Sequence, residues 1–162
     1  MRGPSDLAKL IGENGIAARL IPAGDAATSM KAATALGVEI SKIVKTVVFI
    51  DNEGKPHAVV LLGSRRVNQS KLAKLLGVRR VRLATRSEVS ELTGYEAGGV
   101  PPIGIPIDTI IDSELAAING EVYAGGGDPS TLLEIRVEDI IKIQRPRIMA
   151  VTDTSSIDEK SI

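Results

Sequence analysis

The sequence predicts a mixed α/β fold: one compact domain in which a central, mixed and partly barrel-like β-sheet is flanked by helices. The chain has 162 residues and is 43% hydrophobic, enough for one core and too short for two independent domains. It has no Trp, one Phe and two Tyr, so the core consists of Ile, Val, Leu and Ala, as is typical of buried strands covered by helices. Hairpins and helical crossovers both occur, which predicts a mixed sheet.

Helix and strand patterns alternate in the first half of the chain. Ser5 or Asp6 can cap a first helix, and Gly15 and Gly37 are placed where two helices should stop. The turn at 52–55 lies between two apolar runs and predicts a β-hairpin. The expected helices are 5–14 and 26–36, and the expected strands are 16–21, 43–51 and 57–62.

The second half continues this alternation around a loop rich in Gly and Pro. Gly77 should end one helix, and Thr85 or Ser87 should cap the next. The expected helices are 69–76, 86–93 and 137–143, with a short turn or helix at 115–118, and the expected strands are 79–83, 107–111, 121–124 and 132–137. We therefore expect a single domain over residues 1–146, followed by a polar C-terminal tail at 147–162.

The charges of this formally neutral chain are separated along the sequence. The window 54–87 contains nine basic side chains and no Asp or Glu, whereas most acidic residues follow Glu88. If these basic residues share one face, they would attract a polyanion and bind it in a salt-dependent way. The alternative is an ordinary solvated surface. The basic residues are Lys55, Arg65, Arg66, Lys71, Lys74, Arg79, Arg80, Arg82 and Arg86.

Composition excludes several kinds of site. The chain has no Cys, so it can form neither disulfides nor thiolate zinc sites, and it has no cysteine nucleophile. The single histidine, His57, begins an apolar run and is interpreted as a strand-entry residue rather than a catalytic base. We expect no metal and no cofactor. There is no signal-peptide pattern and no apolar segment of membrane-spanning length, so a cytoplasmic protein without a membrane partner is expected.

Lys45 and Thr46 lie in the apolar run 43–50, which has the pattern of a central strand. Alternation places Lys45 on one face and Thr46 on the other. A lysine in such a strand either extends to solvent at the strand end or points into a cleft, where its ammonium can bind a carbonyl or a phosphate.

Two glycine-rich loops are further candidates for a site. The segment 98–106 contains three Gly and three Pro, which predicts a rigid loop that presents backbone carbonyls to an amine or a water molecule. The segment 125–131 could form a nest of backbone N–H groups for an anion, although a long hairpin connection needs the same residues. Either loop can also be purely structural.

Three segments together resemble the YbaK/ProX family of aminoacyl-tRNA deacylases, which includes the editing domain of prolyl-tRNA synthetases. They are Lys45-Thr-Val-Val48, Gly94-Tyr-Glu-Ala-Gly-Gly-Val-Pro-Pro-Ile-Gly104 and Tyr123-Ala-Gly-Gly-Gly127, and the resemblance spans about 16–143. It implies Lys45 as the essential lysine and Gly98 as the matching member of the catalytic Gly-x-x-x-Pro element. It further implies roles for Pro102, Gly126 and Gly127, and we expect further substrate contacts at Thr46, Gly99, Val100, Pro101 and Gly104. From the basic window we expect tRNA contacts at Arg65, Arg66, Lys71 and Lys74.

The resemblance implies a trans-editing enzyme of the free-standing kind that hydrolyses mischarged tRNA, with tRNA(Pro) and prolyl-tRNA synthetase as the expected partners. Val100, Pro101 and Pro102 would exclude larger amino acids. Ala23 and Leu132 stand where some Cys-specific members carry Tyr and Asp, so Cys, Ala and Ser all remain candidate substrates. The alternatives are a non-catalytic tRNA- or synthetase-binding module of the same fold, and a small-molecule hydrolase or nucleotide-binding protein that uses the loop at 125–127.

Overall fold

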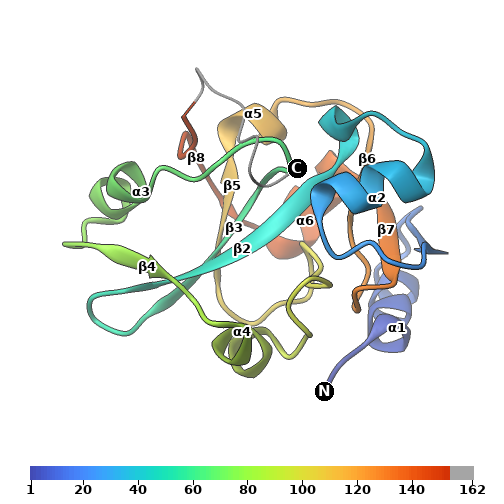
Figure 1. Ribbon diagram of the computed structural model, residues 1–162, viewed down its shortest axis with the longest axis horizontal. Coiled ribbons are helices and arrows are strands. Elements are labelled where there is room, and N and C mark those ends of the chain that lie inside the picture. The colour runs from blue at the N-terminus through green and yellow to red at the C-terminus, as the bar shows by residue number, and fades with distance from the viewer. Residues whose placement is uncertain (154–162) are drawn as a thin grey trace.

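The computed structural model describes residues 1–153 and arranges their strands in two sheets (Figure 1). The smaller sheet has the order β1-β7-β6, with β1 at Arg19–Pro22, β6 at Glu121–Gly125 and β7 at Thr131–Arg136. The larger sheet has the order β4-β2-β3-β5-β8, with β2 at Val44–Asp51, β3 at Pro56–Leu62, β4 at Val81–Leu83, β5 at Asp108–Asp112 and β8 at Arg147–Met149. In the larger sheet, β2 pairs antiparallel with β3 and β4, while β5 pairs parallel with β3 and β8. The predicted mixed α/β class is confirmed.

In the described part of the chain, six α-helices join and cover these strands. They are α1 (Pro4–Asn14), α2 (Ser29–Leu36), α3 (Gln69–Leu76), α4 (Arg86–Thr93), α5 (Ser113–Ala116) and α6 (Val137–Gln144), and a 3-10 turn occupies Ile40–Lys42. The Thr85 hydroxyl accepts a hydrogen bond from the Glu88 N–H, so Thr85 is the predicted cap of α4. Gly15, Gly37 and Gly77 end their helices as predicted, each in the left-handed conformation. Within residues 1–153, none of the helices has the length and apolar character needed to cross a bilayer.

The core has two parts because side chains of β3 alternate between the faces of the larger sheet. Val60 and Leu62 point toward the smaller sheet and pack with Leu133 and Ile135 of β7, and helices α1, α5 and α6 close this layer. Val59 and Leu61 point to the opposite face, where α3 covers them through Leu72 and Ala73. Figure 1 shows α3 on one side of the larger sheet, apart from α1 and α6. Both faces of β3 are therefore buried, as its continuous apolar run indicates.

The sheets do not close into a barrel, so the expected partly barrel-like sheet is wrong. The smaller sheet approaches β2 through a single parallel bridge between Ile43 and Tyr123. Beyond this bridge the cavity described below is lined by the first residues of β2 and by the end of β6. Because β2 and β6 lie on either side of that cavity, they do not hydrogen-bond across it, and the two sheets are not joined further.

Several predicted boundaries also change. β1 begins at Arg19 rather than residue 16, and α2 begins at Ser29 because Thr28 caps it by accepting from the Lys31 N–H. The first helix starts at Pro4, at the position that proline favours, and not after Ser5 or Asp6. The tail does not begin at 147, because β8 pairs with β5 and Val151 is fully buried; residues 154–162 lie outside the described part.

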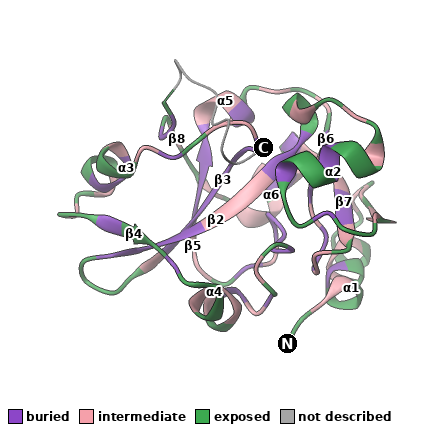
Figure 2. Cartoon of the chain, viewed as in Figure 1, coloured by how far each residue is buried: buried purple, intermediate pink, exposed green. Residues whose placement is uncertain are grey.

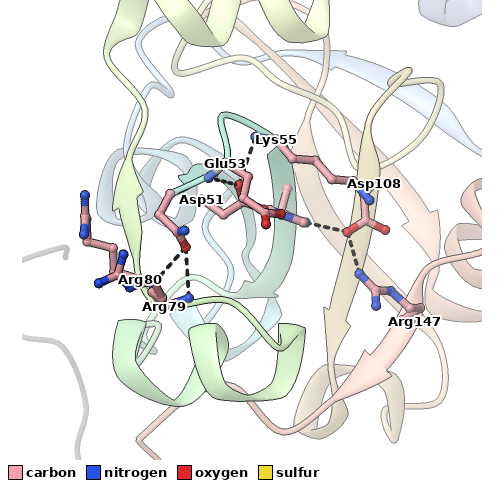
Figure 3. A network of polar contacts seen from close by, with 9 residues as sticks. Asp51, Glu53, Lys55, Arg79, Arg80, Asp108 and Arg147 are labelled. Atoms are coloured by element: carbon pink, nitrogen blue, oxygen red, sulfur yellow. Dashed lines mark hydrogen bonds and ion pairs between the residues drawn. The ribbon is translucent and has the colours of Figure 1, made fainter.

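A network of charged groups, buried at His57 and Asp51 and reaching the surface at Arg147, joins β2, β3, β5 and β8 (Figure 3). His57, at the start of β3, is 3% exposed; its Nδ1 lies 2.6 Å from Asp108 Oδ2 and its Nε2 lies 2.8 Å from Asp51 Oδ2. Arg147 of β8 donates to Asp108 Oδ2 at 2.6 Å. An ionised carboxylate only accepts hydrogen bonds, so this arrangement is fully satisfied when both ring nitrogens carry protons. His57 thus has a structural role, consistent with its interpretation as a strand-entry residue.

The network favours the ionised form of both carboxylates. The hydrogen bond to His57 lowers the pKa of Asp51, with further help from the Lys55 and Glu53 N–H groups. Burial opposes ionisation of Asp108, but hydrogen bonds to His57 and Arg147 outweigh burial and lower the pKa of Asp108 as well. Carboxylates with lowered pKa stabilise the fold above their unfolded pKa of about 3.9 and lose that contribution as pH falls through the lower folded value.

The variant His57→Ala should therefore change both stability and its dependence on pH. It leaves the Asp51 and Asp108 carboxylates without the ring that hydrogen-bonds to both, and we expect the free energy of unfolding at pH 7 to fall by about 3 kcal/mol. Urea unfolding followed by circular dichroism between about pH 6 and pH 2 measures both effects. Stability of the native protein should drop steeply below about pH 4, and the variant should show a shallower slope. Equal slopes would contradict the assigned role of His57.

Candidate functional site

A cavity of about 200 Å³ opens where β2 begins. Its walls come from four parts of the chain that are distant in sequence: the segment leading into α2, the first residues of β2, the loop at 98–100, and the facing ends of β6 and β7. Apart from Lys45, the lining side chains are apolar or are small hydroxyls, and none is acidic. The lining residues are Ala26, Ala27, Thr28, Ser29, Ala32, Ile43, Val44, Lys45, Thr46, Gly98, Val100, Ala124, Gly125 and Leu132.

Lys45 and Thr46 reach this cavity because one edge of β2 is open. On one side β2 pairs with β3 along nearly its whole length, but on the other side it pairs with β4 only from Phe49 to Asp51. Lys45 and Thr46 are both partly buried, and Figure 2 shows this stretch of β2 as intermediate between its buried ends. The open edge therefore brings side chains from both faces of the strand to one space.

The Thr46 hydroxyl is a polar group that the described residues leave unsatisfied. Its Oγ1 is buried and has no hydrogen-bond partner within residues 1–153. A buried hydroxyl without a partner costs free energy, so its position beside the cavity indicates a ligand that can bond to it.

The two glycine loops are in direct backbone contact beside the cavity. The Gly127 N–H donates to the Gly99 carbonyl at 2.8 Å. A Cβ on Gly99 would lie 2.3 Å from the Asp128 carbonyl carbon, and a Cβ on Gly125 would lie 2.3 Å from the Val100 oxygen. Only glycine permits this approach. The contact fixes the loop that presents Gly98, whose φ of +93° is one that other residues rarely adopt.

Only some of the predicted site residues line the cavity. Lys45, Thr46, Gly98 and Val100 line the cavity. The following do not line it: Gly99, Pro101, Pro102, Gly104, Gly126 and Gly127. Gly99, Gly126 and Gly127 make close contacts with backbone, and Pro101 and Pro102 are buried. Gly104 lies against the N-terminal segment, where its carbonyl accepts from the Arg2 guanidinium at 3.2 Å.

One wall of the cavity is formed by residues for which the sequence predicted no functional role. The sequence predicts a helix without a functional role over Ala26 to Ser29 and Ala32, yet residues 26–28 form an irregular segment before α2, and all of these residues line the cavity together with Lys45. Ser29 is 7% exposed and packs against Gly63, where a Cβ would lie 2.3 Å from the Ser29 hydroxyl. The available signal was a run of small residues ahead of a Thr cap.

The basic window contains both paired and unpaired cations. Arg65 forms a bidentate pair with Glu114 at 2.9 and 3.0 Å, and Arg82 pairs with Glu88, whose pKa it lowers to about 2. In contrast, Arg66, Lys71 and Lys74 form no ion pair with any described residue. Of the four basic residues predicted to contact tRNA, Arg65 is thus paired with a carboxylate of the protein.

The loop contact can be tested at Gly99. The variant Gly99→Ala places a methyl group inside the backbone of Asp128, and we expect the protein to lose several °C in Tm or to fail to fold. Gly12→Ala is the matched control because it lies within α1 with no atom near its added Cβ; it should leave Tm unchanged or raise it. Thermal unfolding followed by circular dichroism compares the two. An unaltered Tm for Gly99→Ala would contradict the loop contact.

Known proteins resemble this chain in sequence and in fold. The sequence model of the aminoacyl-tRNA editing domain matches residues 23–143. The proline–tRNA ligase of Aquifex aeolicus is 38% identical over 91 residues, which are 55% of this chain and 16% of that enzyme. The chain thus spans about a sixth of the length of that ligase.

Two further relatives are closer in size. A protein of Enterococcus faecalis, provisionally named a Cys-tRNA(Pro)/Cys-tRNA(Cys) deacylase, is 27% identical over 122 residues, with 74% of each chain covered. A crystal structure described provisionally as a trans-editing enzyme for prolyl-tRNA synthetase superimposes with a TM-score of 0.79 at 29% identity, covering 93% of this chain and 96% of that one. The predicted family is confirmed: the chain belongs to the aminoacyl-tRNA editing domain family.

Proposed function

We propose that this chain removes a small, wrongly attached amino acid from tRNA by hydrolysing the ester that joins them. The observation that carries the proposal is the cavity itself, where one lysine and a fixed glycine loop meet walls of small residues. The names of two relatives support tRNA(Pro) as the substrate and Cys as one amino acid. We place the reaction in the cytoplasm, with prolyl-tRNA synthetase as the source of mischarged tRNA.

The chemistry follows from what lines the cavity. The substrate is an activated ester, so a positioned water can attack its carbonyl carbon without a covalent protein intermediate. The new C–O bond forms as the bond to the terminal ribose oxygen breaks, and that oxygen takes up the proton lost by the water. The Lys45 ammonium would stabilise the negative charge that develops on the carbonyl oxygen. The backbone carbonyl of Gly98 would hold the attacking water or the α-amine, and the Thr46 hydroxyl would bond to the terminal ribose or to the ester.

The walls suggest how the site selects its substrate. Val100, Ala26 and Ala32 are all buried, with exposures of 6%, 6% and 2%, so the cavity cannot easily widen. A close-packed pocket discriminates against side chains that are too large better than against those that are too small. We assign the size limit to Val100 and these alanines, because Pro101 and Pro102 do not face the cavity.

The role of Lys45 is tested with Lys45→Ala. Release of labelled amino acid from Cys-, Ala-, Ser- and Pro-charged tRNA(Pro) should fall at least about 100-fold for the preferred substrate, because the cation at the developing oxyanion is lost. Lys42→Ala is the matched control, since Lys42 is exposed on the preceding 3-10 turn and does not line the cavity. Hydrolysis of none of the four substrates by the native protein, with tRNA binding intact, would favour the non-catalytic binding module instead.

The size limit is tested with Ala32→Val, which fills part of the cavity. We expect hydrolysis of Cys-charged tRNA to fall about tenfold relative to Ala-charged tRNA, because a difference of about one methylene-sized group between two substrates changes selection by roughly this amount. Ala35→Val lies on the exposed side of the same helix and should change neither rate. A matched loss for both substrates would show that Ala32 does not set the size limit. The measurement is kcat/KM for the two charged tRNAs.

A further inference from the structure

A second groove adjoins the cavity, and Lys45 lines both. The groove has a volume of about 200 Å³ and lies between β2, β4 and the start of α3. Its floor is apolar and its rim carries Arg66 and Gln69. No acidic residue lines it. Lys45 is the residue that the two spaces share.

The register of the strands explains the apolar floor. Lys45, Val47 and Phe49 share one face of β2 because side chains two residues apart point the same way. Leu83 of β4 is directly opposite Phe49 in the antiparallel ladder, so it extends the same face. Leu83 is 56% exposed, whereas Phe49, at 3%, supports the floor from beneath. From Lys45 to Phe49 the floor runs about 13 Å along the strand. Two stacked bases, which rise roughly 3.4 Å each, fit within that length.

The charge at the rim is available to a ligand. Two arginines follow one another after β3, but only Arg65 is paired, with Glu114. Arg66 is exposed and forms no ion pair with any residue in 1–153. Lys71, two residues beyond Gln69 on α3, is likewise without an ion pair among these residues. A cationic rim over an apolar floor complements a strand of nucleotides, whose phosphates are anionic and whose bases have apolar faces.

We propose that this groove binds the single-stranded nucleotides that precede the aminoacylated end of the tRNA. The proposal rests on the proposed function, which places the terminal nucleoside and its amino acid in the cavity. Lys45 marks the junction between the two spaces. One or two bases stack on Val47 and Leu83, and the phosphate between them lies against the Arg66 guanidinium. Leu83 and Val47 provide the stacking surface in a chain that has almost no aromatic residues.

Two substrates that contain the same ester distinguish the contribution of the groove from that of the cavity. Aminoacyl-adenosine occupies the cavity alone, whereas aminoacyl-tRNA occupies both. The double variant Arg66→Ala/Leu83→Ser should lose about tenfold in kcat/KM on aminoacyl-tRNA and keep its rate on aminoacyl-adenosine. Leu75→Ser is the matched control, because Leu75 is 47% exposed on α3 and does not line the groove; it should change neither rate. Both groove side chains are exposed, so Tm should remain unchanged.

A binding measurement tests the groove without catalysis. Fluorescence anisotropy with a four-nucleotide RNA that matches the tRNA 3′ end should show weaker binding to the double variant. Arg66→Ala alone should reduce the slope of log K against log salt by about 0.7, the value for one phosphate contact on a single strand.

The outcomes distinguish the two proposals. Lys45-dependent hydrolysis with equal rates for native protein and double variant on both substrates would overturn the groove and leave the editing function standing. Absence of hydrolysis from every charged tRNA, with RNA binding that still depends on Arg66 and Leu83, would overturn the editing function and support the groove. RNA binding that is unchanged in the double variant would overturn the groove, and the exposed apolar floor would then be assigned to a protein partner.

Discussion

The organisation of this protein depends on the one-sided pairing of β2. On the side of β3 the strand is hydrogen-bonded along nearly its whole length, from Val44 to Ile50, whereas on the other side β4 meets only Phe49 to Asp51. Paired β-strands bury their backbone groups, and an unpaired edge leaves them open to solvent or ligand. Here the open stretch carries Lys45 and Thr46. The cavity, the adjoining groove and the separation of the two sheets all follow from this single gap in the ladder.

The remaining walls are held by backbone rather than by side chains. Gly99, Gly125 and Gly127 allow two loops to approach more closely than any side chain would permit, and the loop that presents Gly98 is fixed as a result. A loop fixed in this way offers backbone carbonyls and N–H groups with fixed directions, beside the few polar side chains that line the cavity. This agrees with a composition that has no Cys and commits its only His to the core.

The charge network around His57 stabilises the end of the sheet that lies away from the candidate site. His57, Asp51 and Asp108 join β2, β3 and β5 at the end of β2 opposite Lys45, and Arg147 adds β8. Charge pairs are costly to bury unless each group is fully bonded, and here each ring nitrogen faces a carboxylate oxygen. The network also explains why residues after 146 belong to the fold, since Arg147 is one of its members.

Much of this protein was determined by its sequence alone. Apolar periodicity placed nearly all helices and strands, glycines marked the helix ends, and the Lys-Thr strand with two glycine loops indicated the family. These features are local, because a strand pattern or a helix stop depends on neighbouring residues. Only the tertiary structure decided which residues share a space. It brought Ala26–Ser29 to the same cavity as Lys45 and placed Gly99 and Gly127 in contact between two loops. It also paired Arg65 with Glu114 while leaving Arg66 at the rim of a groove. Such contacts join residues far apart in the chain, and their geometry depends on strand order, register and close packing, which no local pattern encodes.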